Sequence, residues 1–122
     1  MNLTEARQAL ADAVSTLPDV TCVARPVPGN LRPGDAWVTV ARLEPGAFLG
    51  STNATLSAFV VLGADERLAD ASVDALAGAL LDCAYPLYGF ALSVEPQVVT
   101  AGESVPASLY TLALTITLEL SA

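Results

Sequence analysis

The sequence contains no histidine and no lysine, and all 5 of its basic residues are arginines. Without histidine, the chain has no Ser–His or Cys–His nucleophile and no imidazole metal ligand. Without lysine, it has neither a Schiff-base amine nor the lysine of a phosphate-binding loop. Carboxylates and hydroxyls are the remaining groups for catalysis. We therefore expect a protein that is not an enzyme, with no catalytic residues, no metal ligands and no cofactor.

Basic charge is scarce as well, since 5 arginines stand against 13 acidic residues and the net charge is −8. The arginines are scattered along the chain, at Arg7, Arg25, Arg32, Arg42 and Arg67. Binding of nucleic acid through phosphates depends on basic patches, so we do not expect it here. An acidic surface that repels DNA is nevertheless suited to the wall of a channel through which DNA slides.

Cysteine is limited to Cys22 and Cys83, which are far apart in the sequence. Two thiols in an ordinary globular sequence do not make a disulfide framework. We expect two small buried side chains in a reducing compartment, and a disulfide between them stays open as the alternative.

The sequence shows no secretory or membrane segment. Glu5 stands where a signal peptide has its basic region. The longest uncharged stretch, residues 45–64, is interrupted by proline, glycine and a polar run, which argues against a transmembrane helix. We expect a soluble protein that is made in the cytoplasm and has no membrane partner.

Apolar residues at helical spacing predict helices over residues 3–17 and 65–84. Asn2 and Glu5 have the spacing of a capping box at the start of the first helix. Pro18 is expected to end that helix, because the residue before a proline is disfavoured in the α region.

Alternation of apolar and polar residues predicts four main strands, over residues 36–43, 55–63, 89–95 and 110–120. The last of these alternates without a break from Tyr110 to Leu120, as in a half-buried strand. The expected connections are a linker over 25–35 and loops over 44–54 and 98–108. Val20–Val23 is a candidate minor strand.

These elements predict one α+β domain over residues 1–122, in the order α-β-β-α-β-β. The expected fold is a mainly antiparallel four-stranded sheet with both helices packed on one face.

Three surface features are candidates for interaction. The first loop carries Phe48 and Leu49 between glycines, either as an exposed docking element or folded back onto the core. The second loop and the acidic side of the second helix supply the other candidates: Val98, Val99 and Val105, and then Glu66, Asp70 and Asp74. The acidic side is expected either as a solvated face or as the lining of an acidic lumen or contact between subunits.

The whole chain resembles the tail terminator proteins of long-tailed bacteriophages of the siphophage type. The resemblance lies in the order helix, long hairpin, helix, long hairpin in an acidic, histidine-free chain of this size. It includes the opening helix Leu3-Thr4-Glu5-Ala6-Arg7-Gln8-Ala9-Leu10 and the closing strand Leu109-Tyr110-Thr111-Leu112-Ala113-Leu114-Thr115-Ile116.

This resemblance implies a structural protein of the virion tail or neck, made in the cytoplasm of the host bacterium. Terminators form a hexameric ring that caps the tail tube, ends tube polymerisation and presents a surface for head–tail joining. The implied partners are copies of the same chain, the tail tube protein and a head–tail connector or head-closure protein. DNA passes through the ring without specific binding.

Other classes remain open. One is a different neck component, such as a head-closure or connector protein, or a minor tail protein. Another is a protein-binding module of ferredoxin-like type, which the strand order in the sheet distinguishes.

Overall fold

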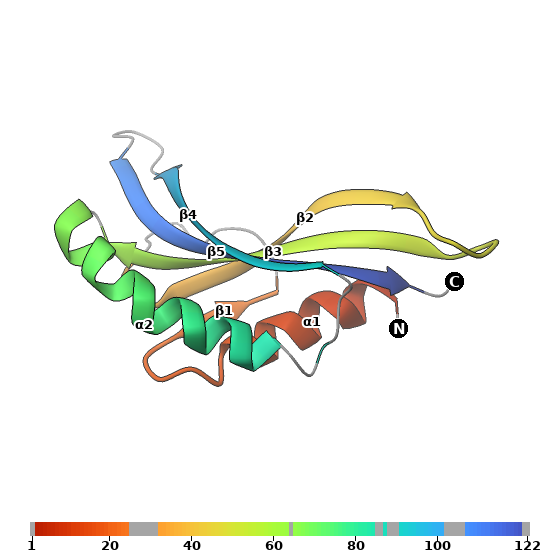
Figure 1. The fold of residues 1–122 in the computed structure, drawn as a ribbon, viewed down its shortest axis with the longest axis horizontal. Helices are drawn as coiled ribbons and strands as arrows, with labels where there is room; N and C mark the ends of the chain where they lie inside the picture. Colours follow the sequence, from red (N-terminus) through yellow and green to blue (C-terminus); the bar gives the residue numbers. More distant parts are fainter. Residues whose placement is uncertain are drawn as a thin grey trace.

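The computed structural model describes residues 2–24, 32–63, 65–84, 87, 91–101 and 107–120. Figure 1 shows a curved sheet with both helices on one side of it. The elements in chain order are α1 (Leu3–Val14), β1 (Thr21–Val23), β2 (Asp35–Pro45), β3 (Thr52–Gly63), α2 (Glu66–Ala84), β4 (Ala91–Ala101) and β5 (Ala107–Leu120). The expected α+β class is therefore confirmed.

Within the described residues the sheet has five strands, so the expected number of four is wrong. The additional strand is β1, the segment considered as a minor strand, which pairs in parallel with the first residues of β2 from Thr21↔Asp35 to Val23↔Trp37. The sequence offered this segment only as a candidate strand, because three residues are too few to show a periodic pattern. The element order is accordingly α-β-β-β-α-β-β.

The strand order is β1-β2-β3-β5-β4, and every pair except β1–β2 is antiparallel. Because β3 and β4 both run antiparallel to β5, they are parallel to each other, with α2 as their crossover. The two outer strands of the antiparallel part, β2 and β4, therefore run in opposite directions. β4 lies at the edge, as does β2 beyond Trp37 within the described residues.

The core lies between the helices and one face of the sheet. The alternation of the last strand is confirmed, because its apolar set from Leu112 to Leu120 is buried against helix residues such as Leu10, Val14 and Leu80. Burial of each such side chain contributes about 1.5–3 kcal/mol.

No helix of the described part of the chain covers the other face of the sheet (Figure 1). Its hydroxyls pair across strands, with Thr55 Oγ1 3.1 Å from Thr117 Oγ1 and Ser57 Oγ 3.1 Å from Thr115 Oγ1. On the same face Trp37 and Phe59 stack, with ring centroids 5.4 Å apart. Trp37 and Val38 thus lie on opposite faces of the sheet, as the alternation predicts.

The capping box that starts α1 is present, since Asn2 Oδ1 accepts from the Glu5 N–H at 2.8 Å and Glu5 Oε1 from the Asn2 N–H at 3.4 Å. The helix ends at Val14, three residues before the expected end at residue 17. The amides of Thr16 and Leu17 bond to carbonyls three residues back, which tightens the last turn before Pro18.

Both loops are shorter than expected, because the strand pairing continues nearly to the hairpin ends. Pairing of β2 with β3 runs to Pro45↔Thr52, with a bulge between Val40 and Arg42. Pairing of β4 with β5 runs to Ala101↔Ala107. The prediction that residues 44–54 and 98–108 are loops is therefore wrong at their ends, where backbone hydrogen bonds form whatever the side chains are.

Candidate interaction surface

The end of the β2–β3 hairpin is a tight turn over residues 46–51. Ser51 Oγ donates to the Phe48 carbonyl at 2.7 Å and accepts from the Phe48 N–H at 3.1 Å. The Ser51 N–H also donates to the Phe48 carbonyl, and the Gly46 N–H donates to the Ser51 carbonyl, each at 3.0 Å. A side chain at Gly46 would collide with that of Ser51, and Gly50 adopts a φ of 84°. The sequence of the turn therefore fixes its shape.

This turn, which we call the hairpin tip (residues 46–51), presents its two large apolar side chains to solvent. Phe48 is 74% exposed and Leu49 is fully exposed. The structure therefore agrees with the expectation that Phe48 is exposed. It does not agree with the alternative that Phe48 folds back onto the core. The tip also lies at the far end of the molecule from the start of α2 (Figure 1). Exposed apolar groups on an ordered turn are suited to contact another molecule.

The second set of predicted interface residues does not form a loop. Val98 and Val99 lie within β4, and since successive residues of a strand point to opposite faces, they are on different sides of the sheet. Val98 is 60% exposed and Val99 is half-buried. Val105 lies outside the described residues.

The predicted acidic side of the second helix is partly described. Asp70 and Asp74 are exposed on α2, whereas Glu66 is the first residue of the helix and its side chain is not described. The one-turn spacing of the two aspartates keeps them on one side of α2.

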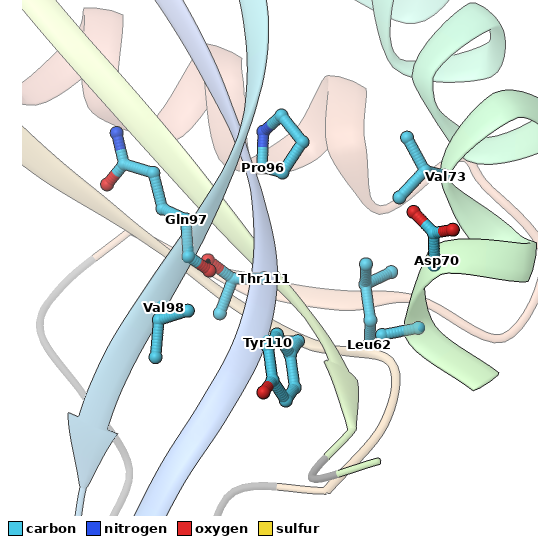
Figure 2. Close-up of a pocket in the computed structure, with 9 residues that line it drawn as sticks. Leu62, Asp70, Val73, Pro96, Gln97, Val98, Tyr110 and Thr111 are labelled. Carbon is cyan, nitrogen blue, oxygen red and sulfur yellow. Dashed lines mark hydrogen bonds between the residues drawn. The ribbon is translucent and has the colours of Figure 1, made fainter. Parts of the chain in front are cut away.

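Asp70 and Val98 line the same cavity, of about 240 Å³, between α2 and the strands β4 and β5. Figure 2 shows Asp70 and Val73 on the helix side, Pro96 and Val98 on β4, and Leu62 and Tyr110 between them. Thr111 Oγ1 donates to the Gln97 carbonyl at 3.0 Å, which ties β5 to β4 beside the cavity. The cavity therefore brings together Asp70, from the predicted acidic side of the second helix, and Val98, from the predicted second loop. The sequence indicated these two groups for separate reasons.

The cavity reflects how α2 packs. Leu80 and Ala84 near the end of the helix are buried in the core and Ala69 near its start is also buried, but Val73 and Leu76 in the middle are only half-buried. The sequence predicted a continuous apolar stripe and contained no signal that Val73 and Leu76 would be less buried than the residues on either side of them.

Both cysteines are free and half-buried, on the side of the sheet that carries the helices. Burial raises the pKa of Cys22 to about 12, with smaller contributions from Cys83 and Asp12. Burial also raises the pKa of Cys83. Because a raised pKa favours the neutral thiol, the resulting stabilisation is present below the unfolded value near 9 and is lost as the pH rises toward 12.

We expect Cys22 to react slowly with thiol reagents in the folded protein at pH 8. A pKa of about 12 in place of 9 lowers the thiolate fraction by two to three orders of magnitude. Alkylation by iodoacetamide, followed at each cysteine by mass spectrometry, should be slower than in the urea-unfolded chain by about that factor. Equal rates in the folded and unfolded chains would contradict it, and a Cys83→Ala variant isolates the signal of Cys22.

Within the described residues, no group of three or more acidic or cysteine side chains is placed to hold a metal ion. Neither helix of the described part of the chain is both long and apolar enough to cross a membrane. Comparison with models of protein families gives no match, and comparison with curated protein sequences gives none either.

Proposed function

We propose that this protein is a structural ring protein of a phage tail, the terminator that caps the tail tube. In this role, six copies form a ring, end tube polymerisation and present the surface for head–tail joining. The partners are the tail tube protein and a head–tail connector or head-closure protein. The chain-wide resemblance in the order of helices and hairpins supports the particular role, and the geometry of the sheet supports the ring.

The ring part of the proposal rests on two sheet edges that run in opposite directions and are unpaired among the described residues. The outer edge of β4 and the edge of β2 beyond Trp37 lie on opposite sides of the sheet. When copies are related by rotation about one axis, β4 of one copy meets β2 of the next in an antiparallel arrangement. Such head-to-tail contacts give a closed ring when the rotation returns to the start.

The acidic side of α2 fits the contact between subunits better than the lumen. Asp70 borders the cavity that Val98 of the edge strand also lines, so a neighbour at β4 would meet Asp70. Asp74 is one turn further along the same helix. The net charge of −8 keeps the ring from binding DNA as it passes through.

The ferredoxin-like alternative predicts a different chain order. This sheet contains one split β–α–β unit, formed by β3, α2 and β4 around β5. However, two pairs of consecutive strands are antiparallel neighbours here, β2 with β3 and β4 with β5. The ferredoxin-like order β-α-β-β-α-β contains only one such hairpin and two crossovers. The other neck or minor tail proteins differ from the terminator in partner and position, which the following experiment addresses.

Negative-stain electron microscopy of the concentrated protein, alone and with purified tail tubes, tests the function. We expect six-fold rings with a central hole of about 20 Å or more, wide enough for duplex DNA, and density at one tube end. Tubes that continue to grow in the presence of the protein would contradict a terminator. A closed two-fold dimer without a hole would contradict the ring.

A further inference from the structure

The side of the sheet that carries the helices has a second, larger hollow, which we call the α1–α2 groove. It has a volume of about 550 Å³ and lies between the end of α1, the end of β3 and the middle of α2. Its lining is mainly apolar and includes Leu17, Val20, Pro33, Leu62, Leu76 and Ala79. Leu76, in the middle of α2, borders the groove and is only half-buried.

The hairpin tip is apolar like the lining of the groove, but it cannot reach the groove of its own chain. Val60 lines the groove, and Thr52 is the strand residue next to the tip. These two residues are eight positions apart on the single strand β3, which is about 26 Å at 3.3 Å per residue. One molecule therefore carries an apolar projection at one end and an apolar recess towards the other.

We propose that Phe48 and Leu49 of one copy occupy the α1–α2 groove of a second copy. This inference rests on the proposed ring and identifies one of its contacts. A projection that fits a recess elsewhere on the same molecule makes a head-to-tail contact, and repeated contacts of this type form a ring or an open filament. The tip carries no charged residue from 46 to 51, so its insertion places no additional charge against a second chain of net charge −8.

The small area of this contact predicts that assembly is cooperative. A large aromatic side chain buries about 150–250 Å², so the tip and its recess fall well short of the roughly 1,200–2,000 Å² of a stable pairwise interface. Through this contact alone two copies associate weakly, and a closed ring, in which every copy both inserts a tip and receives one, is much more stable. Added salt strengthens association, because it screens the repulsion between acidic chains.

Directed disulfide formation between two differently sized versions of the full-length chain tests the contact. Both versions carry Cys22→Ala and Cys83→Ala, one adds Leu49→Cys at the tip, and the other adds Ala75→Cys, at an exposed position of α2 that lines the groove. A disulfide needs Cα atoms within about 7 Å, so a crosslinked pair requires the tip of one copy at the groove of another. We expect about tenfold more crosslinked heterodimer than with a matched Gln8→Cys version, whose cysteine is on the exposed side of α1.

Two further variants separate docking from folding. Phe48→Ser in the tip version should weaken association by about 30-fold, as expected for loss of a buried aromatic anchor. Ala75→Glu should weaken association, because it places a charge in the groove. It should not harm the helix, because glutamate is a good helix former. Gly78→Glu adds the same charge to α2 at an exposed position with open space around it, and should leave association unchanged.

The outcomes distinguish this contact from the function proposed above. Crosslinks together with six-fold rings support both. Six-fold rings with crosslinking no higher than in the Gln8→Cys control overturn the contact and leave the terminator standing. Crosslinked open chains that never cap a tail tube overturn the terminator and leave the contact standing. A protein that stays monomeric and uncrosslinked at all concentrations and salt levels overturns the contact.

Discussion

The Leu114→Asp substitution is expected to unfold the domain. Leu114 is fully buried at the centre of β5, between Ala58 of β3 and Val94 of β4. Loss of the leucine costs about 2–5 kcal/mol, and burial of an unpaired carboxylate costs several kcal/mol more. The sum is comparable to a total stability of about 5–15 kcal/mol. Far-UV circular dichroism and urea unfolding should show an unfolded chain at 25 °C.

Thr115→Asp is the matched control, because it adds the same charge to the next residue of the same strand. Thr115 is half-buried on the helix-free face, and its hydroxyl pairs with Ser57. Loss of that hydrogen bond costs about 1–3 kcal/mol, so the variant should remain folded. Cooperative unfolding of the Leu114→Asp variant at the urea concentration of the unmodified protein would show that the helix-covered face is not the core.

The second large effect is expected from the double substitution of Phe48 and Leu49 by serine. The two side chains make little contact with the rest of the chain, so the urea midpoint should change little. Assembly, by contrast, should be abolished, because both apolar groups of the hairpin tip are lost. Sedimentation velocity at high concentration should then show only monomers, whereas the unmodified protein is expected to form rings.

Leu81→Ser provides the comparison for this effect, since Leu81 is a 38% exposed leucine on α2 and not part of the hairpin. This variant should assemble normally and so exclude a general effect of removing surface apolar groups. Ring formation by the Phe48 and Leu49 variant would remove the hairpin tip from the interface.

Periodicity predicted those parts of the fold that many consecutive side chains determine. The alternation from Tyr110 to Leu120 predicted the central strand, because both faces of β5 lie against different surroundings along its whole length. It failed at the ends of the predicted loops, where residues 44–45, 52–54, 98–101 and 107–108 belong to strands through backbone pairing across a hairpin. Side-chain patterns carry little information about such pairing.

The candidate surface was predictable only where it is local. The position and exposure of Phe48 and Leu49 follow from a short turn with glycine at both ends, which the sequence displays. The meeting of Asp70 with Val98, and the hollow beside Leu76, depend on how far α2 stands off from the sheet. That distance is set by packing between elements far apart in the chain, which no local pattern encodes.

The irregularities at the two free edges bear on how such a subunit stays soluble before it is used. Open strand edges are templates for uncontrolled pairing and fibril growth. Pro96 removes one amide donor from β4, and the bulge between Val40 and Arg42 interrupts the ladder of β2. Neither edge therefore offers a long regular row of hydrogen-bonding groups to an arbitrary strand. In the proposed ring, pairing would therefore be restricted to an edge that accommodates the proline of β4 and the bulge of β2.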